Sequence, residues 1–109
     1  MGIMSLFGKK DINAGMMRFQ EETKAVLLDV RTPAEYMEKR IPGSVNLPLD
    51  EIGKIKFKVP DLNTPIYVYC RSGNRSHTAL GILQKLGYTA VYDIGGILHY
   101  RGRTEGGPK

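Results

Sequence analysis

The chain has 109 residues, 41% of them hydrophobic, which is the size of one globular domain with a single core. Its single cysteine excludes an intrachain disulfide, and no His/Cys spacing suits a structural zinc site. The net charge of +5 comes from scattered lysines and arginines without interleaved aromatic residues. This pattern favours attraction of a small anion and argues against nucleic-acid binding.

The two ends of the chain are predicted to be flexible and the part between them to fold. Residues 1–10 contain too few apolar residues for a secretory signal, and no stretch has the length of a membrane span. Residues 102–109 are Gly-rich and polar, so we expect them to fray. The sequence therefore predicts a cytoplasmic, monomeric protein without membrane attachment, folded over residues 11–101 and needing no cofactor or metal.

The chain opens with a predicted helix, strand and helix. Apolar residues at helical spacing, with Asn13 as the potential cap, predict a helix over residues 14–23. The apolar run 25–30 predicts a buried strand. Thr32, Pro33 and Glu35 then combine an N-cap, a first-turn proline and the acid of a capping box, so a short helix is expected from 33 to 39.

The middle of the chain is less regular. Residues 44–47 predict a short strand that Pro48 ends, after turn residues at 41–43. Residues 49–52 favour a helical turn. Residues 54–60 alternate charged and apolar side chains, which is compatible with an edge strand or with an irregular loop.

The last third predicts two more strands, each followed by a helix. Residues 66–69 predict a buried strand, and apolar residues at helical spacing predict a helix that Gly87 ends. A further strand is expected over 89–92, broken by Gly95 and Gly96 before a short helix at 97–100.

Strands that alternate with helices predict an α/β fold with a parallel sheet. In such sheets, ligands bind beyond the carboxyl ends of the strands. This rule gathers three groups at one edge of the sheet: Asp29 with Arg31, the loop after Cys70, and Asp93 with Gly95 and Gly96.

The loop at this edge is the strongest candidate site. Cys70 opens a polar run, Arg71, Ser72, Gly73, Asn74, Arg75 and Ser76, between a predicted strand and a predicted helix. Backbone N–H groups at a helix start have no intrahelical partner, and the helix dipole is positive there. Such a turn holds an anion and favours a thiolate. An inert, buried cysteine is the alternative, but a donor-rich run is not what core packing requires.

The chain resembles the single-domain rhodaneses, sulfurtransferases that carry sulfur as a cysteine persulfide. The resemblance covers residues 11–101 and rests on four motifs in order, at 28–36, 41–48, 70–76 and 95–97. It implies a rhodanese-like fold, with a small five-stranded parallel sheet flanked by helices on both faces. It also implies that Cys70 accepts the sulfur and that the backbone amides of residues 71–75 surround the persulfide.

Two features depart from the family pattern. Lys39-Arg40 stands where many members have Gly-His before Ile-Pro-Gly, so any role of that histidine is absent. The carboxy-terminal end is also brief, which leaves little chain to cover the last helix.

The arginines near the predicted site have different expected roles. Arg71 is expected to recruit a dianionic donor such as thiosulfate, because a guanidinium recognises oxyanions with a planar fork. A solvent-exposed surface charge is the alternative. Arg75 either binds the donor or pairs with a carboxylate such as Asp29. Arg31 and Glu35, four residues apart, are expected to brace the strand-helix turn.

The small polar residues of the loop also leave alternatives open. Gly73 is expected to give the turn its backbone freedom. Ser72, Asn74 and Ser76 either donate hydrogen bonds to the persulfide or cap the helix, and Ser76 is favoured as a cap. A catalytic role for His77 or His99 is not favoured, because activation at a helix terminus needs no adjacent base.

The sequence thus predicts a sulfurtransferase that moves sulfane sulfur from thiosulfate or a related donor to cyanide, a thiol or a protein acceptor. One alternative is a persulfide carrier or redox-sensing module with little turnover. Another is a relative of the cysteine phosphatases and arsenate reductases, which use Cys-x5-Arg. Here four residues separate Cys70 from Arg75, Tyr69 replaces the usual histidine, and Asp93 is the only obvious acid.

Overall fold

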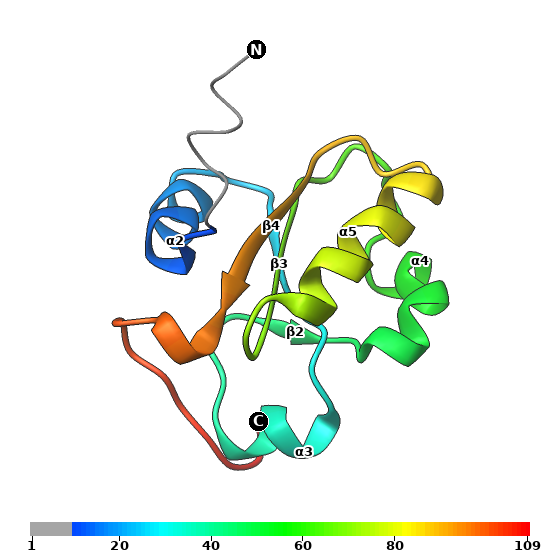
Figure 1. The fold of residues 1–109 in the computed structure, drawn as a ribbon. Helices are drawn as coiled ribbons and strands as arrows, with labels where there is room; N and C mark the ends of the chain where they lie inside the picture. Colours follow the sequence, from blue (N-terminus) through cyan, green and yellow to red (C-terminus); the bar gives the residue numbers. More distant parts are fainter. Residues whose placement is uncertain (1–9) are drawn as a thin grey trace.

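A parallel β-sheet of four strands organises the fold (Figure 1). In this computed structural model, which describes residues 10–109, the strand order is β2-β1-β3-β4. The strands are β1 (Val26–Asp29), β2 (Val45–Asn46), β3 (Ile66–Cys70) and β4 (Val91–Gly96). The α-helices are α2 (Ile12–Gln20), α3 (Pro33–Glu38), α4 (Ile55–Lys58) and α5 (Asn74–Lys85), and the 3₁₀ helices are η1 (Leu49–Lys54) and η2 (Ile97–His99).

The predicted parallel α/β fold is confirmed, whereas the expected fifth strand is absent from residues 10–109. The segment predicted to be flexible at the amino terminus lies, except for Lys10, outside the described residues. Within the described part of the chain, no helix combines the length and hydropathy needed to cross a bilayer.

Helices cover both faces of the sheet, as predicted. Side chains alternate along β3, so Val68 and Cys70 enter one core cluster and Tyr67 and Tyr69 enter the other. The first cluster includes Leu83 of α5 and residues of η1 and α4, and the second includes residues of α2. Figure 1 shows α2 and α5 on opposite sides of β3 and β4.

The segment that was compatible with an edge strand or a loop is helical instead. In an extended strand, Ile55, Phe57 and Val59 would point to the same face. In the structure Ile55 and Val59 are buried while Phe57 is 89% exposed. The buried residues Ile52, Ile55 and Val59 follow the i, i+3, i+7 spacing of a helix that packs one side on the sheet. Both the edge strand and the irregular loop are therefore wrong.

Helix α2 begins two residues earlier than the helix predicted over residues 14–23. Asp11 is its N-cap, and its carboxylate accepts hydrogen bonds from Asn13 N at 3.0 Å and Ala14 N at 3.4 Å. Asn13, the predicted cap, lies inside α2. Its side chain donates to His99 O and accepts from Arg101 N, both at 2.9 Å. These bonds connect α2 to the chain around η2.

The two glycines predicted to break the last strand lie inside it. A register shift opposite Val68 and Tyr69 places a bulge in β4, and Gly95 takes a φ of +101° there. Gly96 pairs with Cys70, and a Cβ added at Gly96 would come within 2.7 Å of Ser72 Cα. The glycines therefore let the loop after Cys70 approach the end of β4.

The carboxy-terminal residues, for which the sequence predicts fraying, lie against α3 in the structure (Figure 1). Arg40 and Glu105 exchange two backbone hydrogen bonds, of 2.8 and 2.9 Å, and Gly107 N donates to Met37 O at 2.7 Å. The Arg40 guanidinium also donates to Glu105 Oε2 and Gly107 O. The composition of this segment does not predict these contacts, because they involve backbone groups and because Glu105 lies 65 residues from its partner Arg40.

Gly96→Ala should destabilise the protein by about 1–3 kcal/mol, because the added methyl group has to displace backbone atoms of the loop. Gly81→Ala is the matched control, since Gly81 lies in α5 with open space around its Cα. That change should be neutral or stabilising by up to about 1 kcal/mol. Urea unfolding measures both; equal stability of Gly96→Ala and the parent would contradict the close approach.

Candidate functional site

The centre of the sheet provides a crevice at the carboxyl ends of β1 and β3. The chain crosses from β1 to β2 on one side and from β3 to β4 on the other, which makes the β1/β3 boundary a topological switch point. Asp29 ends β1 and Cys70 ends β3. The structure therefore places the predicted groups at one edge.

The Cys70 sulfur lies inside a small cradle of hydrogen-bond donors. Sγ accepts from Gly73 N at 3.0 Å and from Ser76 N at 3.3 Å, and the thiol donates to Ser76 Oγ at 3.5 Å. Gly73, with φ of +110°, turns the chain back over the sulfur so that α5 begins at Asn74. Two backbone N–H groups at a helix start thus point at the sulfur, an arrangement that stabilises a negative charge.

Two backbone amides donate to the bare Cys70 sulfur, and one of them lies outside residues 71–75. Among residues 71–75, Gly73 is the one whose N–H reaches Sγ, and Ser76 supplies the other. The N-cap of α5 is Gly73 rather than Ser76, although the Ser76 hydroxyl donates to Gly73 O at 3.1 Å. Ser72 and Asn74 are exposed, and within residues 10–109 their side chains form no hydrogen bond.

A buried ion pair supports the β1 side of the crevice. Arg31 Nη2 lies 2.6 Å from Asp29 Oδ2, Nε donates to both carboxylate oxygens, and Arg31 N donates to Oδ1 at 2.8 Å. Burial works against the charge on Arg31, but the hydrogen bond and charge of Asp29 outweigh it and raise the pKa of the guanidinium. Arg31 also donates to Lys39 O at 2.6 Å. Arg31 therefore braces the strand-helix turn mainly by its bonds to Asp29 and to the backbone after α3. Its contact with Glu35 is a single 3.4 Å hydrogen bond to the backbone oxygen.

Of the two roles left open for Arg75, the structure shows an ion pair with a carboxylate, which belongs to Glu35 of α3 and not to Asp29, the example given. Nη1 lies 2.7 Å from Oε1 and Nη2 lies 3.0 Å from Oε2, a two-bond contact between α5 and α3. The Arg75 hydrogen bond, with help from Thr32, lowers the pKa of Glu35 to about 2, although partial burial opposes the shift. Thr32 and Glu35 also form the predicted capping box, which is confirmed. The sequence indicated the capping role of Glu35. It did not indicate that Glu35 also pairs with Arg75, which lies 40 residues away.

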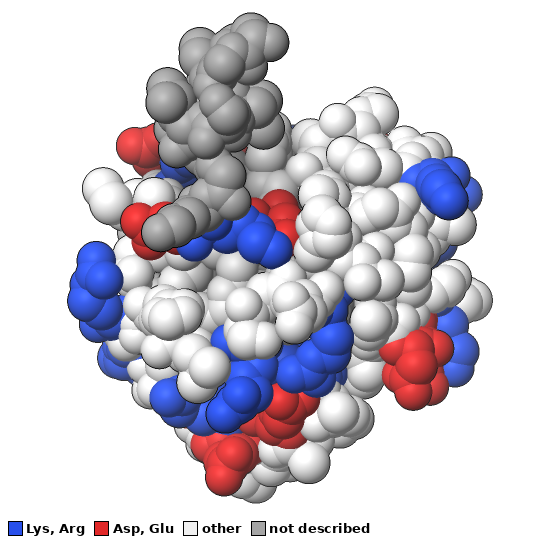
Figure 2. All heavy atoms as spheres, in the orientation of Figure 1, with Lys and Arg blue, Asp and Glu red and all other residues white. Residues whose placement is uncertain are grey.

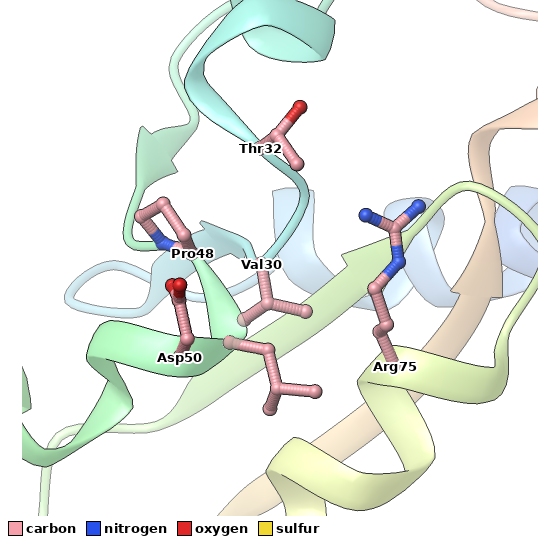
Figure 3. A pocket seen from close by; sticks show the side chains of 6 residues that line it. Val30, Thr32, Pro48, Asp50 and Arg75 are labelled. Carbon is pink, nitrogen blue, oxygen red and sulfur yellow. The ribbon is translucent and has the colours of Figure 1, made fainter.

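Two pockets flank this ion pair. The first, of about 360 Å³, lies beside Arg75 and is mostly apolar (Figure 3). Figure 3 shows Arg75 reaching from the start of α5 toward Thr32, with Val30, Pro48 and Asp50 across from it. The second, of about 410 Å³, is more polar and is lined by Arg31, Glu35, Glu38, Lys39, Arg71, Ile97 and Leu98.

Positive charge gathers around the second pocket. Figure 2 shows Lys and Arg side chains together between α3 and the loop before α5, with acidic side chains beside them. Arg71 is exposed, and within residues 10–109 its guanidinium forms no hydrogen bond or ion pair. Arg71 is therefore the arginine of the loop whose donors are available to a ligand.

The remaining candidates take no part in the cradle. The hydrogen bonds of the Cys70 sulfur go to Gly73 and Ser76, not to His77 or His99. The Asp93 carboxylate accepts from Gly95 N at 3.1 Å and pairs with Lys10 at 2.7 Å. In the part of the chain that the structure describes, no three His, Cys, Asp or Glu side chains gather as metal ligands.

The Glu35–Arg75 pair should make part of the stability dependent on pH. The folded-state pKa of Glu35 is depressed to about 2 from 4.5, so its contribution is complete above about pH 5 and is lost as the pH falls toward 2. After screening by solvent, Glu35→Gln should cost about 1 kcal/mol at pH 7. Urea unfolding of both proteins should show this difference shrinking between pH 5 and 2; a constant difference would contradict the assignment.

Comparisons with known proteins agree with this fold and site. The family model of the rhodanese-like domain matches residues 14–101. Thiosulfate sulfurtransferase PspE of Escherichia coli is 41% identical over 71 residues, covering 64% of this chain and 68% of its own length. Thiosulfate sulfurtransferase GlpE of Pseudomonas syringae is 37% identical over 75 residues, 69% of this chain and 70% of that protein.

Relatives also include a protein of different description and a solved structure. Putative sulfur carrier protein YrkF of Bacillus subtilis is 38% identical over 80 residues, or 72% of this chain, but the match spans 43% of YrkF. A solved structure described as a rhodanese with anions, from E. coli, superposes with a TM-score of 0.71 at 36% identity, over 76% of this chain and 99% of that one. The chain therefore belongs to the rhodanese-like domain family.

Proposed function

We propose that the protein transfers sulfane sulfur from thiosulfate, or a related small anionic donor, to a thiophilic acceptor through a persulfide on Cys70. The observation that carries this proposal is the Cys70 sulfur at the end of a buried strand, within 3.3 Å of two backbone N–H groups. The related proteins PspE and GlpE, named as thiosulfate sulfurtransferases, support the donor assignment.

The reaction has two half-steps, both at the sulfur of Cys70. In the first, the thiolate attacks the outer sulfur of thiosulfate; a new S–S bond forms, the donor S–S bond breaks, and sulfite leaves with the bonding electrons. In the second, cyanide or a thiolate attacks the outer sulfur of the persulfide; a bond to that sulfur forms, the persulfide S–S bond breaks, thiocyanate or a new persulfide leaves, and the Cys70 thiolate keeps the bonding electrons. Negative charge lies on sulfur at the beginning and end of both steps, so fixed amide donors stabilise it without reorganising.

The donor is expected to enter by the second pocket. Arg71 and Lys39 line it, and thiosulfate carries two negative charges for them to attract. Arg75 is engaged by Glu35 through both terminal nitrogens, which leaves Arg71 as the better oxyanion partner. A fork of guanidinium donors matches the sulfonate end of the donor and directs its outer sulfur toward the cradle.

A persulfide carrier with little turnover is the second candidate function. It is favoured by the relative named as a putative sulfur carrier and by the burial of Cys70, which is 1% exposed. A carrier would accept sulfur from its donor and release it only to a docked protein. The phosphatase alternative is disfavoured because Asp93, its acid candidate, is paired with Lys10 and bonded to Gly95 N.

Treatment with thiosulfate should add one sulfur atom to the intact protein, and dithiothreitol should remove it. Cys70→Ser should gain nothing, because Cys70 is the only thiol in the chain. Intact-mass spectrometry measures both. A parent protein that gains no reducible sulfur would show the central proposal to be wrong, and a parent that loads but turns over feebly with cyanide would support the carrier.

Arg71→Ala should lower kcat/KM for thiosulfate by about ten- to a hundredfold, since hydrogen bonds to charged groups contribute about 1.5–3 kcal/mol each. The matched control is Arg18→Ala, because Arg18 lies over the Tyr92 ring, away from the loop. Steady-state assays with cyanide as acceptor separate the two. An unchanged kcat/KM in Arg71→Ala would remove Arg71 from donor recognition.

A further inference from the structure

Lys10, which lies just before α2, contacts the loop after Cys70 although 63 residues separate it from Gly73. Its Nζ donates to Gly73 O at 2.9 Å and lies 2.7 Å from Asp93 Oδ2. Its stem lies against Gly95, where an added Cβ would come within 3.2 Å of Lys10 Cβ. Gly73 and Gly95 both have positive φ, so the lysine packs between two backbone turns that admit no side chain without strain.

The carbonyl that Lys10 contacts belongs to the cradle. Gly73 O also accepts from Ser76 Oγ at 3.1 Å and from His77 N at 3.2 Å, and Gly73 N is the nearest donor to the Cys70 sulfur. The Ser76 hydroxyl has a single proton. With the neutral thiol, that proton points to Gly73 O, while the S–H group donates to Ser76 Oγ.

Ionisation of the Cys70 thiol changes which groups donate and which accept in these hydrogen bonds. When the S–H proton leaves to solvent, the thiolate becomes an acceptor 3.5 Å from Ser76 Oγ. The hydroxyl then turns its proton from Gly73 O to the sulfur, and Gly73 O loses one donor. Lys10 Nζ at 2.9 Å and His77 N at 3.2 Å remain on that carbonyl, and Lys10 is the shorter and the charged donor of the two, so it compensates most for the hydroxyl that turns away.

We propose that Lys10 is a positioning residue for the sulfur chemistry at Cys70. Its ammonium group holds the Gly73 carbonyl, releases the Ser76 hydroxyl to the anionic sulfur, and adds positive charge to the loop. The inference rests on the proposed function, since it concerns the thiolate and the persulfide that this function requires. It assigns to Lys10 a role in the site that is distinct from folding.

Other charged groups face the loop from every neighbouring element. They are Asp93 of β4, Arg71 of the loop, Arg75 and His77 of α5, Glu35 of α3, and the Asp29–Arg31 pair at the end of β1. Among these groups, Asp93 loses its ion-pair partner in a Lys10 variant, so an Asp93 variant has to be measured beside it.

The test is the rate of Cys70 alkylation by iodoacetamide as a function of pH, measured on the full chain. In Lys10→Met the midpoint of the profile should move upward by about half a unit to one unit, so alkylation at pH 7 falls about three- to tenfold. Lys10→Arg should stay close to the parent. Lys85→Met, in the last turn of α5, is the matched control and should leave the profile unchanged.

Two further variants separate positioning from loss of structure. Lys10→Gln keeps a donor for Gly73 O without the charge, so its midpoint should fall between those of the parent and Lys10→Met. Asp93→Asn removes the carboxylate that balances Lys10, so its midpoint should move downward. Upward shifts of similar size in Lys10→Met and Asp93→Asn would indicate a disordered loop and overturn the proposal.

A Lys10→Met profile that superposes on that of the parent would also overturn it. If Lys10→Met does not fold, Lys10→Gln decides the question by the same criterion. Alkylation needs no sulfur donor, so this test is independent of sulfur transfer. A protein that alkylates as expected yet never gains sulfur from thiosulfate would contradict the proposed function alone.

Discussion

Direct backbone contact between the loop after β3 and the end of β4 is the constraint on which the site depends. The loop lies so close to Gly96 that a single methyl group has no room there. The turn after Cys70 then continues through Gly73, whose left-handed conformation is open to it because it has no Cβ. The amides of Gly73 and Ser76 then converge on one sulfur atom.

Ion pairs hold the other sides of the same loop. A buried ion pair needs further hydrogen bonds to be stable. Here Arg31 N donates to Asp29 Oδ1, and the Arg31 guanidinium donates to Lys39 O. The Glu35–Arg75 pair joins α3 to the start of α5. These contacts hold the carboxyl ends of β1 and β3 in place, which is the pre-organisation that the proposed sulfur chemistry requires.

Local patterns in the sequence predicted the parts of the structure that depend on local physics. The capping box at Thr32, the buried strand before Cys70 and the polar helix start after it all depend on neighbouring residues. The strand-end rule also placed Asp29, Cys70 and Asp93 at one edge, because parallel strands align their carboxyl ends.

Features that depend on distant partners were not predictable from the sequence. The partner of Arg75 is 40 residues away, and the contacts of Lys10 are 63 and 83 residues away, so no spacing indicates them. Alternating charge at residues 54–60 resembled a strand, but packing of Ile55 and Val59 on the sheet made the segment a helix. Gly95 and Gly96 were predicted to break the strand. They lie within β4, and the reason for glycine at Gly96 is the loop after Cys70, which the pattern of β4 itself does not reveal.

The central claim is that the Cys70 loop holds an anionic sulfur with the N–H groups of Gly73 and Ser76. Nitrogen–proton correlation spectra of the ¹⁵N-labelled protein before and after loading with thiosulfate test it most directly. The account predicts that the Gly73 and Ser76 amide protons move downfield most, and that dithiothreitol reverses the change. Loading that leaves these two resonances unmoved, with the largest shifts elsewhere, would contradict it.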